Sequence, residues 1–218
     1  MLDGKELTIG VSGMLRKNAL VMYDRETETL WSHFTGEALA GPLMGKTLKI
    51  VESSPRVKWS EWVKRHPKSK LLIANGVTHA PSNYGGYFSS PRTGMGSVGN
   101  EDGRLQGKKL VLGVLSGGKA TAAPMTLLRS VGVVHTTLDG KDIAIYFDPE
   151  LGMYGAVVLP DGVRIKSVSR RSIVAESGRK WSAIDGAGDG GDLEMLPALR
   201  TFWFAWADHY PDTGLVAK

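Results

Sequence analysis

Residues 19–23, Ala-Leu-Val-Met-Tyr, and residues 29–31, Thr-Leu-Trp, decide how the first part of this chain folds. Both runs are rich in side chains that favour strands, and a polar turn at residues 24–28 separates them, which predicts a β-hairpin. Further out, residues 7–11 and 47–51 alternate between apolar and polar or small side chains and predict two more strands. The N-terminal part is therefore expected to form a small β-sheet.

The six tryptophans occur in two triplets with the same order and the same neighbours. Each triplet opens with Trp-Ser, has a glycine at the same distance, continues with Trp-x-x-Trp and is followed by a proline. The matching positions are Trp31, Gly36, Trp59, Trp62 and Pro67 in the first triplet and Trp181, Gly186, Trp203, Trp206 and Pro211 in the second. Duplication of one ancestral unit explains this order, because chance placement would scatter the tryptophans.

Segments of helical composition occur at residues 60–65, directly after Trp59, and at residues 202–209, and a proline ends each segment. Each Trp-x-x-Trp pair is expected on the helix at its segment. Side chains three positions apart lie on one face of a helix, so we expect each pair to plug the sheet against which its helix packs. After each helix, residues 71–73 and 215–216 are short apolar runs that predict one more strand.

Additional strands are expected between the two Trp-x-x-Trp helices, at residues 109–114, 132–137 and 142–147. Asp139-Gly140 joins the last two, and this dipeptide is typical of a two-residue hairpin turn. The expected fold is mainly β, β-rich with a few short helices, built from an internally duplicated β unit that ends each time in a short Trp-x-x-Trp helix.

The repeat divides the chain into three parts. A first, truncated repeat is expected at residues 1–74, a Gly/Ser-rich linker or loop at residues 75–107 and a second repeat at residues 108–218. The 218 residues are expected to form one compact domain, because β-sandwiches and barrels of about 200–250 residues are common.

The composition excludes several classes of protein. Without cysteine the chain can form no disulfide, no thiolate nucleophile and no cysteine-ligated metal site. Its net charge of +5 is modest for a nucleic-acid-binding protein, so no nucleic-acid partner is expected. No apolar run reaches about 18 residues and the first residues lack the apolar core of a signal peptide, so we expect a soluble chain without a membrane span and leave its location open.

Several blocks of the sequence carry a resemblance to a known family. These blocks are residues 10–15, 18–25, 30–32, 36–38, 41–43, 112–114, 117–120 and 133–140. They resemble the DUF3179 proteins, a bacterial and archaeal family whose function is unassigned. Such proteins usually carry a Cys-Pro-x-Cys-like element ahead of the first block, whereas this chain starts at Met1 and has no cysteine. The resemblance implies a duplicated fold, and the missing cysteines exclude thiolate chemistry in this chain. Because the first unit lacks its opening strands, we expect either that the start of the sequence is incomplete or that another strand or a homo-oligomer covers the open sheet edge.

One polar cluster in the first hairpin is the best candidate for a site. Its members are Asn18, Tyr23, Asp24, Arg25, Ser32 and His33. Asp24 and His33 are candidate catalytic residues or a metal pair, Arg25 is suited to an anionic ligand, and the others are candidate binding residues. The alternative is structural, with Asp24 accepting N–H groups of its own turn. The second copy has Ala183 where His33 stands, which favours a single functional copy.

Three functions remain open at this point. The first is a ligand-binding or interaction module for an unknown small molecule or protein, without an organic cofactor, because no complete catalytic motif is present. The second is an enzyme, such as a small-molecule hydrolase, that uses Asp24, His33 and Arg25. The third is a metal-binding protein, although the five histidines lack the spacing that places two imidazoles on one metal, and no metal ligand is assigned.

Overall fold

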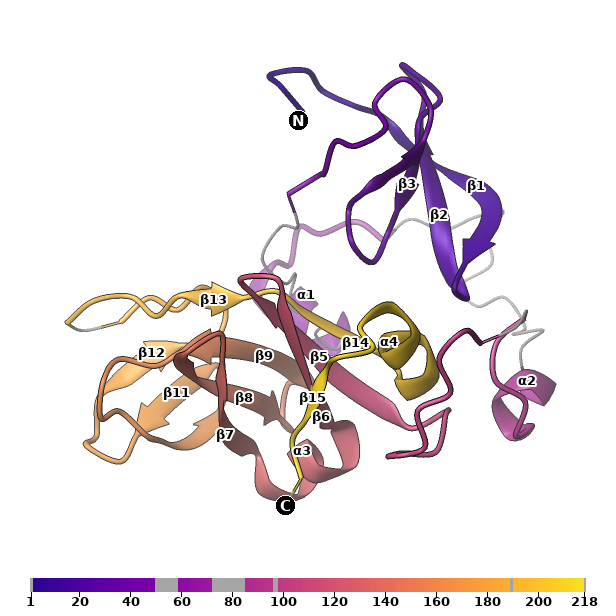
Figure 1. The fold of residues 1–218 in the computed structure, drawn as a ribbon. Coiled ribbons are helices and arrows are strands. Elements are labelled where there is room, and N and C mark those ends of the chain that lie inside the picture. Colours follow the sequence, from indigo (N-terminus) through magenta and orange to yellow (C-terminus); the bar gives the residue numbers. More distant parts are fainter. Residues whose placement is uncertain (1, 50–58, 72–84, 96–97, 189, 218) are drawn as a thin grey trace.

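A computed structural model describes residues 2–49, 59–71, 85–95, 98–188 and 190–217. The described residues are β-rich and contain four sheets and four short helices (Figure 1), as the sequence predicts. The expected strand at residues 47–51 is not found in its described part, where Thr47 forms only an isolated bridge with Glu37, and its last two residues lie outside the described residues. Of the expected strand at residues 71–73 only Leu71 is described, and it lies in no strand; most of the first half of the expected linker also lies outside the described residues.

The N-terminal sheet has the strand order β1-β2-β3-β4. Its strands are β1 (Ile9–Arg16), β2 (Ala19–Asp24), β3 (Leu30–Ser32) and β4 (Ala38–Ala40). The first three strands were predicted, although β1 begins two residues later than expected and runs five residues further. The turn between β1 and β2 is tight because Lys17 and Asn18 both adopt positive φ angles, the conformation that a two-residue hairpin turn requires.

The C-terminal body contains three further sheets. One has the order β14-β5-β6-β15 and is formed by β5 (Leu110–Ser116), β6 (Lys119–Pro124), β14 (Ala198–Phe202) and β15 (Gly214–Leu215). The next has the order β13-β9-β8-β7 and is formed by β7 (Val133–Leu138), β8 (Lys141–Asp148), β9 (Met153–Val158) and β13 (Met195–Leu196). The third is formed by β10 (Ile165–Ser169), β11 (Ser172–Ala175) and β12 (Lys180–Ser182). The predicted hairpin at Asp139-Gly140 joins β7 to β8, and both turn residues have positive φ.

The sheet that contains β8 and β9 is the middle layer of the body. On one face its side chains, including Ala144 and Tyr146, form a core with Ile173 and Trp181 of the β10–β12 sheet. On the other face its side chains, including Ile145, pack against residues of β5. Because side chains alternate across a strand, neighbouring residues of β8 serve the two cores.

The four helices are short and differ in burial. They are α1 (Trp59–Arg65), α2 (Gly85–Ser89), α3 (Met125–Val131) and α4 (Trp203–His209). The predicted packing of the tryptophan pair against a sheet is confirmed for α4, where Trp203 and Trp206 are fully buried. Trp206 lies so close to Gly113 that a side chain at position 113 would clash with the indole. It is wrong for α1, where Trp59 and Trp62 are exposed.

The sequences of the two helices explain this difference. Residues 203–207 of α4 are all apolar and can be buried on every side. Helix α1 carries charges between its tryptophans, and the Trp62 indole is used locally, where it packs on His66 with ring centroids 4.1 Å apart and donates to Ser69 Oγ at 2.9 Å.

Equivalent backbone hydrogen bonds follow Trp31 in the first predicted repeat and Trp181 in the second. Gly36 N–H donates to Ser32 O at 2.8 Å, and Gly186 N–H donates to Ser182 O at 2.9 Å. Both glycines have positive φ, and in both a Cβ would collide with a carbonyl oxygen of the returning chain. The Trp-Ser-x-x-x-Gly spacing therefore has the same structural cause in both places.

Candidate functional site

Asp24, the centre of the predicted cluster, is buried inside its own turn. Its carboxylate accepts hydrogen bonds from Thr27 N–H at 2.6 Å, from Thr27 Oγ1 at 2.8 Å and from Trp31 Nε1 at 2.8 Å. Burial raises the pKa of Asp24, but the hydrogen bonds from Trp31 and Thr27 outweigh it, so the pKa lies below its usual value. The carboxylate is thus ionised and its lone pairs are occupied by protein donors.

His33 lies at the opposite end of β2 from Asp24. The backbone N–H of His33 donates to Leu20 O, whereas that of Asp24 donates to Thr29 O. Four residues of extended strand separate Leu20 from Asp24, which corresponds to about 13 Å. The structure therefore does not bring the two candidate catalytic residues within hydrogen-bonding reach of each other.

The predicted binding residues mostly make internal contacts. Asn18 Oδ1 accepts Met95 N–H at 2.9 Å, and the buried Ser32 Oγ accepts Thr35 N–H at 3.1 Å. The exposed Arg25 guanidinium lies 5.8 Å from the centre of the Tyr23 ring. A ligand role for Tyr23 and Arg25 stays a prediction.

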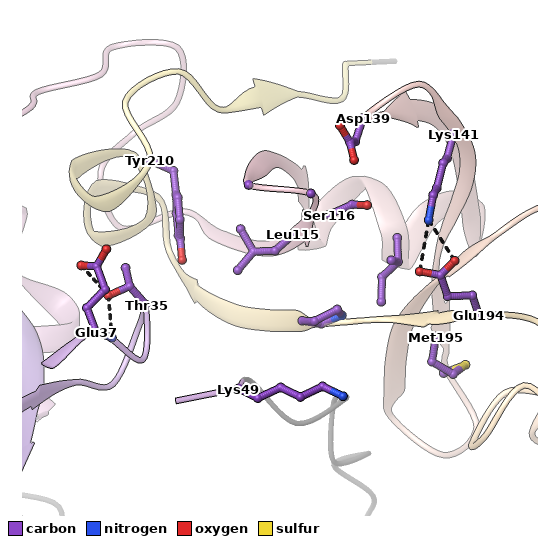
Figure 2. Close-up of a pocket in the computed structure, with 14 residues that line it drawn as sticks. Thr35, Glu37, Lys49, Leu115, Ser116, Asp139, Lys141, Glu194, Met195 and Tyr210 are labelled. Atoms are coloured by element: carbon purple, nitrogen blue, oxygen red, sulfur yellow. Dashed lines mark hydrogen bonds and ion pairs between the residues drawn. The ribbon is translucent and has the colours of Figure 1, made fainter. Parts of the chain in front are cut away.

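A cavity of about 680 Å³ lies where the N-terminal sheet meets the C-terminal body (Figure 2). Four turns or connections and the end of α4 supply its walls, through side chains that are mostly polar. The residues used below are Glu37 after β3, Gly117 between β5 and β6, Asp139 between β7 and β8, Lys141 at the start of β8, Glu194 before β13, Tyr210 after α4, and Lys49. Parts of the chain far apart in sequence therefore converge on it.

The cavity has one neutralised ion pair and two charges without a partner. Lys141 Nζ lies 3.0 Å from Glu194 Oε2, which balances those two residues. Among the described residues, Lys49 and Asp139 have no hydrogen-bond or ion-pair partner, and Figure 2 shows them on opposite sides of the cavity. The cavity thus presents the unpartnered cation of Lys49 and the unpartnered anion of Asp139, together with the carboxylate of Glu37, which accepts a hydrogen bond from the Thr35 hydroxyl at 3.1 Å and has no ion-pair partner among the described residues.

Gly117 makes room for the Asp139 carboxylate. A Cβ on Gly117 would overlap Asp139 Oδ2, whereas a Cβ on the next residue, Gly118, would meet no atom within 4 Å. Both glycines have positive φ, at 50° and 78°. The absence of a side chain at Gly117 is therefore required by the position of Asp139 as well as by the turn.

Tyr210 ties the cavity wall to the N-terminal sheet. Its hydroxyl donates to Phe34 O at 3.2 Å. Burial, together with the negative charge of Glu37, raises the pKa of Tyr210 to about 12, so the phenol stays protonated and remains a donor. The ring of Phe34 also stacks on His209, with centroids 4.3 Å apart. These contacts fix the distance between the two sides of the cavity.

A second cavity, of about 530 Å³, lies beside His135 between β7 and the start of β10. Nε2 of His135 accepts Ile165 N–H at 3.0 Å, which requires a neutral imidazole. This histidine is therefore used to hold two sheets together.

Other kinds of site were sought within the same described ranges. There, no group of three or more His, Asp or Glu side chains is placed to hold a metal ion. No helix of the part of the chain that the structure describes is long and apolar enough to cross a membrane.

The described residues form stacked, mostly antiparallel sheets with a polar cavity, which defines a β-rich class of protein. Within that class, the chain belongs to the DUF3179 family, described as a protein family of unknown function, whose model matches residues 1–213. This confirms the resemblance seen in the sequence. Searches of curated proteins and of solved structures found no match.

The cavity residues were not among the predicted site residues. Sequence signals for them exist in the turn dipeptides Gly117-Gly118 and Asp139-Gly140, which mark the ends of strands. Nothing in the local sequence indicates that these two turns meet Lys49 and Tyr210, because that depends on how the sheets stack.

Proposed function

We propose that this protein is a binding module whose ligand is a small polar molecule that carries both an ammonium group and an anionic group. The observation that carries the proposal is the pair of unpartnered charges, Lys49 and Asp139, on opposite sides of the cavity. A zwitterion of the amino acid or short peptide type would pair its ammonium with Asp139 and its carboxylate with Lys49. Charge-assisted hydrogen bonds of this kind are roughly twice as strong as neutral ones.

The size and composition of the walls support a small ligand. A volume of about 680 Å³ is within the range of small-molecule sites, which span about 300–1,000 Å³. The Lys141–Glu194 pair keeps one side of the cavity neutral, so the charges of Lys49, Asp139 and Glu37 are the ones that orient a ligand.

Thermal-shift and calorimetric titrations with free amino acids, dipeptides, simple amines and simple carboxylates test this function. We expect zwitterions to raise the melting temperature, because a ligand that binds only the folded state stabilises it. Asp139→Asn and Lys49→Ala should each weaken binding at least about tenfold. Binding that survives both substitutions, or the absence of any shift across the panel, contradicts the proposal.

Gly117→Ala and Gly118→Ala form a matched pair for the same titration. Both place a side chain at a positive φ and share that strain, but only the methyl group of Gly117→Ala displaces the Asp139 carboxylate. Gly117→Ala should therefore weaken zwitterion binding while Gly118→Ala leaves it unchanged. Equal effects of the two substitutions would assign the change to the turn and not to Asp139.

We further propose that the chain contains two repeats, residues 1–74 and 108–218, and that the hairpins ending in Trp31 and Trp181 descend from one ancestral unit. The shared hydrogen bonds around Gly36 and Gly186 support this origin. The different surroundings of the two Trp-x-x-Trp pairs are compatible with it only if the helices diverged after duplication.

A further inference from the structure

The described walls of the 680 Å³ cavity carry more negative than positive charge. Their charged residues are Glu37, Lys49, Asp139, Lys141 and Glu194. Lys141 and Glu194 neutralise each other, so the charges that remain are the ammonium of Lys49 and the carboxylates of Glu37 and Asp139. A ligand with one anionic and one cationic group pairs with Lys49 and with only one of the two carboxylates. These walls are therefore complementary to a ligand that carries a second cation.

Glu37 has a fixed backbone and a carboxylate that can accept more hydrogen bonds. Ser32 N–H donates to Glu37 O at 2.9 Å, and Glu37 forms an antiparallel bridge with Thr47. The Thr35 hydroxyl donates to Glu37 Oε2 at 3.1 Å, and it is the one hydrogen bond that the described residues make to this carboxylate. Because a carboxylate offers about four acceptor positions, Glu37 can bind a cation without losing Thr35.

An apolar wall lies between the carboxylates of Glu37 and Asp139, where Figure 2 shows the Tyr210 ring and Leu115. Burial raises the pKa of Tyr210 and the charge of Glu37 adds to that effect, which places Glu37 beside the phenol. At the other end, Leu115 lies two residues before Gly117, and Gly117 lies directly against the Asp139 carboxylate. Tyr210 and Leu115 both pack against the buried core around α4. The order along the cavity is thus carboxylate, apolar wall, carboxylate.

From this order of groups we infer that the ligand of the cavity is a basic amino acid, with an aliphatic stem that ends in an ammonium or guanidinium group. The inference rests on the proposed function, which assigns the α-ammonium to Asp139 and the α-carboxylate to Lys49. The methylene groups of the stem lie along Leu115 and the Tyr210 ring, where both sides lose apolar surface to water. The terminal cation pairs with Glu37, and the neighbouring Tyr210 ring attracts it further.

Calorimetric titration of the full chain with two pairs of amino acids tests the inference. The first pair is L-lysine and L-norleucine, and the second is L-arginine and L-citrulline. Within each pair the α-groups are the same and the stems are alike, so the terminal charge is the difference that is measured. At matched ionic strength we expect the basic member of each pair to bind about fivefold tighter, because Glu37 is exposed and an exposed ion pair contributes modestly.

Glu37→Gln and Glu28→Gln are a matched pair of variants for the same titrations. Each removes one negative charge from an exposed position, but Glu28 lies in the turn between β2 and β3, away from the cavity walls. Glu37→Gln keeps an oxygen for the Thr35 hydroxyl, so it should abolish the preference for lysine and leave norleucine binding unchanged. Glu28→Gln should keep the preference. Asp139→Asn should weaken lysine and norleucine alike, since both place an α-ammonium there.

The titrations separate failure of this inference from failure of the proposed function. A lysine preference that Glu37→Gln removes and Glu28→Gln keeps supports the inference. Norleucine that binds as tightly as lysine overturns it and leaves the zwitterion site standing, and so does a lysine preference that persists in a folded Glu37→Gln variant. If no member of either pair binds, both proposals are wrong. Circular dichroism shows whether each variant folds, and if Glu37→Gln does not, the preference of the wild-type chain for lysine over norleucine decides alone.

Discussion

Asp24 accepts hydrogen bonds from Thr27 and from the Trp31 indole inside a turn that solvent does not reach. The second hairpin has Ala175 at this place, and there the Trp181 indole donates to Gly191 O at 3.0 Å. Both buried indole N–H groups need an acceptor, and the two hairpins supply it differently: a side-chain carboxylate in the first and a backbone carbonyl in the second. A carboxylate that seems suited to catalysis in the sequence has a structural use here.

Asp24→Ala should lower the free energy of unfolding by about 3 kcal/mol, because it leaves the Trp31 indole N–H and the Thr27 donors without an acceptor. Arg25→Ala, at an exposed neighbouring position, should change it by less than about 0.5 kcal/mol. Urea denaturation followed by tryptophan fluorescence measures both. Because the pKa of Asp24 is lowered on folding, its contribution should be present above its usual pKa and disappear as the pH falls through the lowered value. A fully stable Asp24→Ala variant would return Asp24 to the list of candidate functional residues.

At the scale of single elements, α1 and α4 share a motif and differ in environment. Helix α4 is apolar on every side and is enclosed, and Trp206 Nε1 donates to Thr213 Oγ1 at 2.8 Å within that enclosure. Helix α1 carries lysine and arginine and keeps its indoles at the surface. The other residues of each helix, more than the tryptophans themselves, therefore account for whether the helix is buried.

Trp206→Ala should destabilise the protein by about 3–5 kcal/mol, since it removes a fully buried indole and leaves a cavity over Gly113. Trp62→Ala should cost less than about 1 kcal/mol, because that ring is 39% exposed and contacts only its own segment in the described structure. Chemical denaturation of the two variants gives the comparison. Similar losses of stability would mean that α1 is as firmly packed as α4.

For the whole molecule, contacts of Lys17, Asn18 and Phe34 connect the N-terminal sheet to the body. Lys17 Nζ donates to Asp208 O at 2.7 Å, and Phe34 stacks on His209. His209 is also surrounded by charges of both signs, Lys17 and Asp208 among them, and burial is the main cause that lowers its pKa. Burial likewise lowers the pKa of His135, with the charge of Arg164 acting in the same direction.

The stability of the whole chain should consequently fall in mild acid. Folding lowers the pKa of His135 and of His209, so as the pH falls these histidines take up protons in the unfolded chain before they do so in the folded chain. Their contribution to the free energy of unfolding is therefore fully present above about pH 6.5 and is lost as the pH falls through the lowered pKa values. Melting temperatures measured between about pH 8 and pH 5 should be level and then decline. Replacing His135 and His209 by glutamine should reduce the decline, and the part that remains is assigned to His33, whose pKa is also lowered by burial. An unchanged slope in the double variant would exclude these two histidines as the cause.

Much of the fold could be predicted because its signals are local. Strands β2, β7 and β8 have short apolar runs with marked ends, and Asp139-Gly140 specifies its own turn through two positive φ angles. The candidate site could not be predicted in this way. Lys49 and Asp139 reach one cavity through the stacking of separate sheets. Lys49 stands in no motif, and the Asp139-Gly140 dipeptide predicts a turn but not what that turn faces.

The pairing of β15 with β6 has a consequence for how the chain is made. Gly214 and Leu215 pair in parallel with Thr121 and Ala122, and Val216 N–H donates to Ala122 O. During translation, β6 emerges from the ribosome long before its neighbour exists, so one of its edges must wait unpaired while most of the body is synthesised. Until residues 214–216 have emerged, this edge of β6 stays open to pairing with other strands, so the nascent chain gains its protection against aggregation late in the synthesis of the domain.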